Sequence, residues 1–307
     1  MIYEKNKVKN KMKLQIGFIG LGTMGKGMVK NLLKNDYKFV CYNRTKEKGN
    51  DITHENFSMV DNPSEVCPGS AMIFTCVTND EALNEILFEK NGIFQTLNSD
   101  NILVDSSTTS IEFTQKIYEE CDKRYVSFFD APITGSKLGA ENGTLMFMYG
   151  GDKNLFEKCK KVFVAMGQRF VHCGKNTYGQ RAKISLNLVQ SLIMQSYYES
   201  VILALKNGVP LNAILEIFDN SGAKNVVASV KNPSLRNRDF SVNFKLELMR
   251  KDLHLADNEI KKLDLNLPLS KQISKVYDKA YDMGLGQEDF LATIKLLEKE
   301  SGKEIRE

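Results

Sequence analysis

A short apolar run that leads directly into three spaced glycines constrains this chain more than any other feature. Gln15–Ile19 has the composition of a buried strand, and the pattern Gly-x-Gly-x-x-Gly follows it at once. The first glycine permits a tight turn, the second lets backbone approach a phosphate, and the third lets the next helix pack closely on the strand. Free N–H groups at that helix start favour an anion. We therefore expect a dinucleotide pyrophosphate to bind at Gly20, Leu21, Gly22, Thr23, Met24 and Gly25.

The two halves of the chain have different patterns. Up to about Gly174, short apolar runs alternate with amphipathic stretches, which is typical of a parallel sheet with crossover helices. The expected strands are Gln15–Ile19, Lys38–Tyr42, Met72–Cys76, Ile102–Asp105, Ser127–Asp130, Leu145–Tyr149 and Arg169–His172. After Tyr178 no strand is expected. The expected helices are Gly179–Asn207, Asn212–Asn220, Asn243–Leu263, Leu269–Met283 and Gln287–Lys299, with turns at Asn232–Pro233 and Leu267–Pro268.

These patterns predict an α/β protein in which a Rossmann-type, doubly wound parallel sheet precedes an all-helical domain built around a long interdomain helix. Residues 1–13 form a basic N-terminal extension without the apolar stretch of a signal peptide. Residues 14–176 form the NADP-binding domain, and residues 177–307 form a helical domain for substrate binding and dimerisation. The cleft between the two domains is the expected active site.

The end of the second expected strand bears on the choice between NAD(H) and NADP(H). An NAD-preferring site usually carries Asp or Glu here, where the carboxylate accepts from a ribose hydroxyl. This chain reads Asn43-Arg44-Thr45-Lys46. The planar guanidinium of Arg44 can hold a 2′-phosphate, Thr45 offers a hydroxyl and Lys46 adds a further charge. A solvent-exposed basic turn would have the same composition. Combined with the glycines upstream, Asn43, Arg44 and Thr45 favour NADP(H), with NAD(H) as the alternative.

Two later segments carry residue types that carbonyl chemistry needs. In Asp130-Ala-Pro-Ile-Thr-Gly-Ser, the Thr134 hydroxyl and the flexible Gly135 backbone can form a compact carboxylate or carbonyl site, although an ordinary turn has this composition too. Lys183 and Asn187 are four residues apart on the long expected helix, so they project from one face. A lysine in a partly desolvated cleft can donate a proton to a carbonyl oxygen. Most Lys and Asn side chains of helices are solvent-exposed, but the neighbours of this pair are apolar.

Composition excludes several other functions. The 42 Lys and Arg residues nearly balance the 38 Asp and Glu residues and are spread along the chain, so no nucleic-acid partner is expected. Six cysteines without a Cys-x-x-Cys pair, and only three histidines, lack the spacing of a metal site, and reduced cytosolic thiols are the default. No run of 18 apolar residues indicates a membrane span. We expect a cytoplasmic protein without a metal.

Taken together and in this order, the motifs resemble those of the β-hydroxyacid dehydrogenase family over roughly Leu14 to Leu297. The resemblance implies that Lys183 is the catalytic acid/base and that Asn187 assists it. The family usually carries Ser at Thr134 and Gly at Ser136. The implied substrate-binding residues are Thr134, Gly135, Ser136, Phe244 and Asp252, and the further cofactor-binding residues are Val77, Thr78, Thr108 and Lys251.

Two related groups fit less well. The 6-phosphogluconate dehydrogenases place a His just before the Asn, where this chain has Leu186, and imine reductases generally lack the lysine found at Lys183. Without the resemblance, Lys251 and Asp252 would be interpreted as an exposed ion pair on an amphipathic helix.

The chain looks most like the glyoxylate/succinic semialdehyde reductase branch of the family. That resemblance implies NADP(H)-dependent hydride transfer to or from a small carboxylate-bearing aldehyde or hydroxyacid, in a homodimer or homotetramer. The alternatives are an NAD-dependent 3-hydroxyisobutyrate dehydrogenase or a tartronate semialdehyde reductase. A non-catalytic dinucleotide-binding protein is a third, because a fold does not determine a function.

Overall fold

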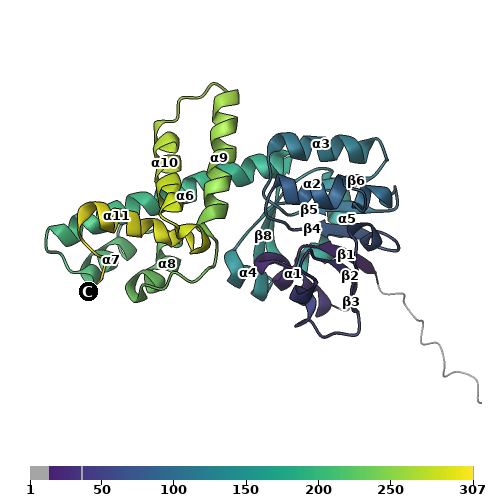
Figure 1. Cartoon of the computed structure of the whole chain (residues 1–307), viewed down its shortest axis with the longest axis horizontal. Helices are drawn as coiled ribbons and strands as arrows, with labels where there is room; N and C mark the ends of the chain where they lie inside the picture. The colour runs from purple at the N-terminus through teal and green to yellow at the C-terminus, as the bar shows by residue number, and fades with distance from the viewer. Residues whose placement is uncertain (1–13, 36, 307) are drawn as a thin grey trace, which may run out of the picture.

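The computed structural model describes residues 14–35 and 37–306, so the extension expected at 1–13 lies outside the described residues. A sheet occupies one end of the molecule and a group of helices the other (Figure 1). The sheet has the strand order β3-β2-β1-β4-β5-β6-β8-β7, and β9 pairs with β8. Its strands are β1 (Gln15–Ile19), β2 (Lys38–Tyr42), β3 (Phe57–Met59), β4 (Met72–Thr75), β5 (Ile102–Asp105), β6 (Ser127–Asp130), β7 (Ile133–Thr134), β8 (Leu145–Gly150) and β9 (Gly167–Gly174).

Five helices cover the sheet, and three short 3₁₀ turns lie between them. The helices are α1 (Thr23–Leu33), α2 (Asp80–Phe88), α3 (Ile111–Asp122), α4 (Ser136–Asn142) and α5 (Lys153–Val164), and the turns are η1 (Lys46–Gly49), η2 (Pro63–Val66) and η3 (Ile93–Gln95). One buried cluster lies beneath α1, α4 and α5, and a second lies beneath α2 and α3. Helices therefore cover both faces of the sheet, as the sequence predicts for a doubly wound fold.

The sheet is parallel from β3 to β6, but β8 runs antiparallel to β6 and β7. The parallel sheet that the sequence predicts is therefore confirmed from β3 to β6, and antiparallel pairs that were not predicted extend it at this end. A parallel connection needs a crossover of a dozen or more residues, usually through a helix. The 14 residues between β6 and β8 are long enough for a crossover, but they form β7 and the short α4, and β7 pairs antiparallel with β8, so the chain turns back instead of crossing the sheet. Strands β3 and β7, which have three and two residues, were not expected from the sequence.

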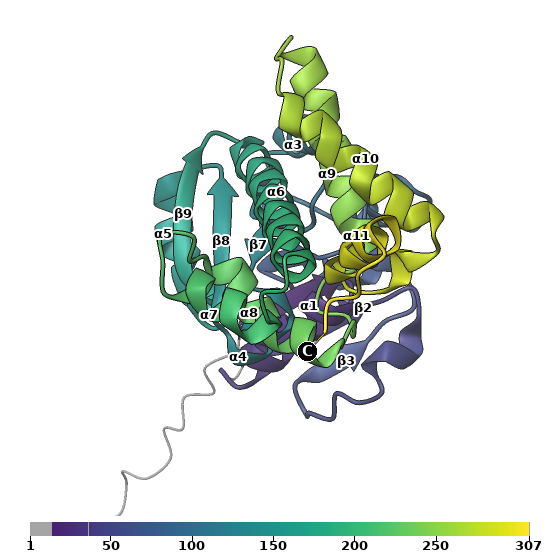
Figure 2. The ribbon, with the colours of Figure 1, turned by 90° about the vertical axis from the view of Figure 1, so that its left-hand side faces the viewer.

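Helix α6 (Tyr178–Lys206) connects the sheet to the helical group. Its first turns pack on β8 and β9, and from Met194 onward it belongs to the helical core. Packed around it are α7 (Leu211–Asp219), α8 (Val226–Asn237), α9 (Leu246–Lys262), α10 (Pro268–Asp282) and α11 (Ile294–Ser301), with turns η4 (Leu285–Gln287) and η5 (Phe290–Thr293). Figure 2 shows α9, α10 and α11 together on one side of α6. The long interdomain helix is thus confirmed.

Three expectations for the helical part are wrong in detail. The turn expected at Asn232–Pro233 is the interior of α8, where the Asn225 side chain caps the helix start and Asn232 and Leu235 are buried. Those contacts compensate for the backbone hydrogen bond that proline cannot donate. Helix α9 begins at Leu246, so Phe244 lies in the preceding loop and not on the helix. The helix expected at Gln287–Lys299 is largely 3₁₀ turn before α11 begins.

Within residues 14–35 and 37–306, no helix is long and apolar enough to cross a bilayer. The same residues contain no group of three or more His, Cys, Asp or Glu side chains that could hold a metal ion. All six cysteines are free thiols.

Candidate active site

The turn between β1 and α1 is shaped by its glycines. Gly20 has φ +106°, and a Cβ there would collide with the Cys76 carbonyl. A Cβ on Gly25 would collide with the Gly20 carbonyl, so that glycine lets α1 approach the strand. A Cβ on Gly22 would meet nothing within 4 Å, and no side chain caps the helix start there. The free N–H groups of α1 thus face open space, and this fits a phosphate.

Asn43 fastens this turn to the end of β2. Its Oδ1 accepts a hydrogen bond of 2.8 Å from the Leu21 N–H, and its Nδ2 donates one of 2.7 Å to the Thr45 carbonyl. The amide is therefore engaged in holding two loops together. Asn43 lies beside the glycine turn, as the sequence predicts, but its hydrogen bonds are structural ones.

A cavity of about 140 Å³ lies beside the glycine turn. Arg44, Thr45 and Lys48 line one wall, and Glu85 of α2 lines another. Lys46, which the sequence pointed to as a further charge for the cofactor, instead forms an ion pair of 2.5 Å with Asp61. Lys48 was not expected here. It takes the place expected for Lys46 because η1 turns the chain between the two lysines.

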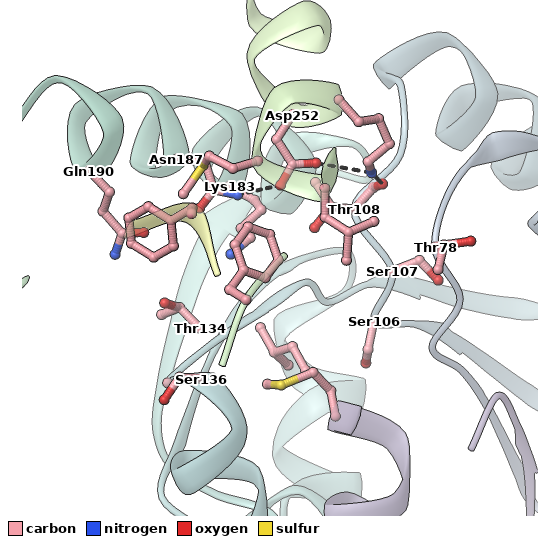
Figure 3. Close-up of a pocket in the computed structure, with 18 of the residues that line it drawn as sticks. Thr78, Ser106, Ser107, Thr108, Thr134, Ser136, Lys183, Asn187, Gln190 and Asp252 are labelled. Atoms are coloured by element: carbon pink, nitrogen blue, oxygen red, sulfur yellow. Dashed lines mark hydrogen bonds and ion pairs between the residues drawn. The ribbon is translucent and has the colours of Figure 1, made fainter. Parts of the chain in front are cut away.

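A larger cavity of about 350 Å³ lies between the carboxyl edge of the sheet and the helical group (Figure 3). It brings together residues that the sequence predicts from six separate segments: Met24, Val77, Thr78, Thr108, Thr134, Gly135, Ser136, Lys183, Asn187, Phe244, Lys251 and Asp252. Cys76, Val77 and Thr78 line both cavities, so the two are adjacent. An extended ligand can therefore reach from the glycine turn to Lys183.

Several lining residues were not expected from the sequence. Gln190 lies three residues after Asn187 on the same face of α6, so helical periodicity could have found it. Figure 3 shows its side chain beside those of Asn187 and Lys183. Lys231 of α8 and Phe290 of η5 also line the cavity, and no local sequence signal marks them, because only packing around α6 brings them there.

Asp252 of α9 is the centre of a buried polar cluster. It is 1% exposed, and its Oδ2 accepts a hydrogen bond of 2.5 Å from the Asn187 Nδ2. Its Oδ1 lies 2.9 Å from the Lys251 ammonium, which also donates to the Thr108 carbonyl in the loop after β5 (Figure 3). The cluster therefore ties α6 and α9 to the sheet domain. It also leaves the second N–H of Asn187 free of Asp252.

Lys183 is buried at the wall of the cavity, with 7% of its surface exposed. Burial lowers the pKa of its ammonium from 10.5 to about 8, the negative charge of Asp252 opposes that shift, and the positive charge of Lys251 adds to it. Lys183 forms no hydrogen bond or ion pair with the rest of residues 14–35 and 37–306. Its amine is thus available to a ligand and can be protonated or neutral near pH 8.

Asp130 sets the position of α6 and hence of Lys183. Its Oδ1 accepts from the Thr177 N–H at 2.8 Å, and its Oδ2 accepts from the Gln180 N–H at 2.9 Å. The Gln180 side chain in turn donates to the Ser107 carbonyl at 2.8 Å. Burial raises the pKa of the Asp130 carboxyl to about 7, and the two backbone hydrogen bonds counter that rise. The Lys183 turn is therefore held in register with the β5–α3 loop.

The segment between β7 and α4 has strained backbone. Gly135 has φ +138°, and Ser136 has φ +58°, in the left-handed region that favours glycine. A side chain there costs about 1 kcal/mol. Thr134 and Gly135 both line the cavity on the side opposite α9.

On the helical side, the Phe244 N–H donates to Asp289, and Asp289 also forms an ion pair of 2.6 Å with Lys231.

Comparisons with known proteins agree with this architecture. A family model described as the NAD binding domain of 6-phosphogluconate dehydrogenase matches residues 15–174. A second, described as the NAD-binding of NADP-dependent 3-hydroxyisobutyrate dehydrogenase, matches residues 177–297. The chain is 30% identical over 281 residues to an Arabidopsis thaliana protein named glyoxylate/succinic semialdehyde reductase 1, covering 92% of this chain and 97% of that protein.

A further relative and a solved structure are similar over nearly their whole length. A mitochondrial 3-hydroxyisobutyrate dehydrogenase of Drosophila melanogaster is 30% identical, covering 93% of this chain and 90% of that protein. The crystal structure of a 3-hydroxyisobutyrate dehydrogenase from Salmonella typhimurium superposes with a TM-score of 0.83 at 21% identity, covering 92% of this chain and 100% of that one.

Proposed function

The chain belongs to the β-hydroxyacid dehydrogenase family and is an NAD(P)-dependent oxidoreductase, and from this premise we propose that it moves hydride between NADP(H) and a small carboxylate-bearing aldehyde or hydroxyacid. The observation that carries the proposal is the buried Lys183 amine, whose pKa is lowered to about 8 in a cavity that it shares with Thr134 and Gly135. A proton donor with a pKa near the working pH suits carbonyl reduction.

Four residues of the cavity have direct roles in this proposal. A bound nicotinamide supplies or accepts the hydride. Lys183, as the ammonium, donates a proton to the carbonyl oxygen in reduction, and as the neutral amine it accepts the proton of the hydroxyl in oxidation. Asn187 uses the N–H group that Asp252 leaves free to orient the reacting oxygen. The Thr134 hydroxyl and the backbone at Gly135 hold the substrate carboxylate.

The domain division and the assembly are parts of the same proposal. Residues 14–176 bind the dinucleotide and residues 177–307 complete the substrate site. The position of the second buried core, which begins at Met194 and contains only residues of the helical part, supports this division. We propose a homodimer or homotetramer in the cytoplasm, which the family resemblance favours.

Glyoxylate and succinic semialdehyde are the first candidate substrates, and 3-hydroxyisobutyrate and tartronate semialdehyde are the alternatives. The equal identity to the reductase and to the dehydrogenase supports testing all four. Steady-state kinetics of each compound with both cofactors, followed by absorbance of the reduced nicotinamide, decides among them. We expect the highest kcat/KM for an aldehyde with NADPH. Binding of NADPH without turnover of any compound would favour a non-catalytic dinucleotide-binding protein.

Arg44 is the residue on which the choice of NADP(H) rests. We expect Arg44→Gln to weaken NADPH binding about tenfold and NADH binding less than about twofold, because only NADPH presents a 2′-phosphate to the guanidinium. Isothermal titration of each reduced cofactor measures the change. Lys46→Gln is the matched control, because Lys46 pairs with Asp61 and does not line the cavity. Equal losses for the two cofactors after Arg44→Gln would remove the argument for a 2′-phosphate site.

A further inference from the structure

The cavity beside the glycine turn has walls of opposite charge. Arg44 and Lys48 contribute two cations from the segment after β2, and Glu85 contributes an anion from α2. The Arg44 Nη1 and the Glu85 Oε2 are 3.9 Å apart. The phenol of Tyr42, which lines the same cavity, lies close enough to both charges for Glu85 to raise its pKa and for Arg44 to lower it, after the larger effect of burial. Both charges therefore act on a group that lines the cavity.

The Arg44–Glu85 ion pair is free to respond to a ligand. The two side chains are 79% and 53% exposed, so their contact contributes little to folding stability. The backbone of α2, in contrast, is held in place. Asn79 caps the helix by accepting from the Ala82 N–H at 3.0 Å, and Asp80 accepts from the Ser110 N–H at 2.9 Å. The backbone at Glu85 thus stays beside the cavity whether or not Arg44 turns away from the carboxylate.

A 2′-phosphate and a 2′-hydroxyl make different demands on these charges. The phosphate monoester carries a charge between −1 and −2 near neutral pH, and it must take Arg44 from Glu85 while it is repelled by the same carboxylate. A hydroxyl is neutral and leaves the ion pair intact. We propose that Glu85 determines how strongly this chain prefers NADP(H) over NAD(H), by competing with the 2′-phosphate for Arg44.

The inference rests on the proposed function in requiring that the chain binds a nicotinamide dinucleotide with the 2′-position of its ribose beside Arg44. Because Glu85 competes for Arg44, the preference for NADP(H) over NAD(H) is weaker than Arg44 and Lys48 would produce without it. Glu85 is therefore a specificity-determining residue in an element, α2, that the glycine motif and the Asn43-Arg44-Thr45 segment do not include.

Titration of the protein with NADPH and with NADH, without substrate, tests the proposal. Glu85→Gln retains the shape of the side chain and removes its charge, so we expect the Kd for NADPH to fall about fivefold at low ionic strength and the Kd for NADH to change less than about twofold. Glu81→Gln is the matched control, because Glu81 is exposed on the same helix and does not line the cavity. It should leave both Kd values unchanged.

Two further measurements separate competition from a structural effect. The gain in NADPH affinity from Glu85→Gln should become smaller at high salt, because exposed charges are screened. It should also become smaller in an Arg44→Gln background, where no guanidinium remains to compete for. An unchanged NADPH Kd in Glu85→Gln, or an equal gain with and without Arg44, overturns the proposal. If Arg44→Gln itself leaves NADPH binding unchanged, the proposed NADP(H) preference fails as well, and the two failures are thereby distinguished.

Discussion

Replacing Lys183 with Ala is expected to lower kcat for aldehyde reduction at least about 10²-fold, with the Kd for NADPH changed less than about twofold. The loss follows from removing the buried amine that donates the proton, while the glycine turn and the Arg44 cavity are left intact. Single-turnover kinetics together with NADPH titration measures the two effects separately. Lys183→Arg is the informative second variant, because a guanidinium retains the positive charge but is a far weaker acid than an ammonium.

The pH dependence of the unmodified protein tests the same role. The Lys183 ammonium is the donor in reduction, and its pKa is about 8, so kcat/KM for the aldehyde should be constant below pH 8 and decline above it. Oxidation of the hydroxyacid requires the neutral amine, and its rate should rise through the same pH. Near-normal turnover of Lys183→Ala, or a profile that does not change near pH 8, would reject Lys183 as the acid/base.

Asp252 is expected to have the second largest effect. Asp252→Asn should lower kcat about 10²-fold, because an amide has one accepting oxygen where the carboxylate has two, so it cannot accept from both the Asn187 Nδ2 and the Lys251 ammonium, and the cluster that orients Asn187 is disrupted. The variant also removes the negative charge that raises the pKa of Lys183. The midpoint of the pH profile for reduction should therefore move below 8. Steady-state kinetics across pH measures both changes.

The shift of that midpoint distinguishes an electrostatic role of Asp252 from a structural one. A purely structural effect of Asp252→Asn would lower kcat by the same factor at every pH and leave the midpoint in place. Asp257→Asn is the control, since Asp257 lies on the same helix outside the cavity and its carboxylate accepts from the Ser270 hydroxyl. We expect it to retain both kcat and the profile.

The parts of the site that follow from local chemistry could be predicted from the sequence. Gly20 and Gly25 are required wherever a strand turns tightly into a closely packed helix, so their spacing identifies that turn without any tertiary information. Lys183 and Asn187 share a helix face by periodicity alone. Spacing could not assign roles to these residues, and only the resemblance to a family did so.

The residues that local chemistry could not assign are those whose partners come from distant segments. Lys46 and Lys48 are equivalent in the sequence, and only the η1 turn and the position of Asp61 direct one away from the cavity and the other into it. Phe244 was expected on a helix, but the Asp289 carboxylate, 45 residues away, holds its backbone in a loop. The positions of these residues depend on long-range contacts that override local propensity.

By itself, the sequence determined the change from alternating strands and helices to helices alone, the glycine turn and the presence of an amine and an amide on one face of α6. These depend on backbone sterics and on periodicity, which act within a few residues. Only the tertiary structure decided that α9 brings Asp252 to Asn187, that burial lowers the pKa of Lys183 to about 8, and that Glu85 faces Arg44. Desolvation and charge–charge interactions depend on distances in space, and those distances exist only once α6, α9 and the sheet have packed together.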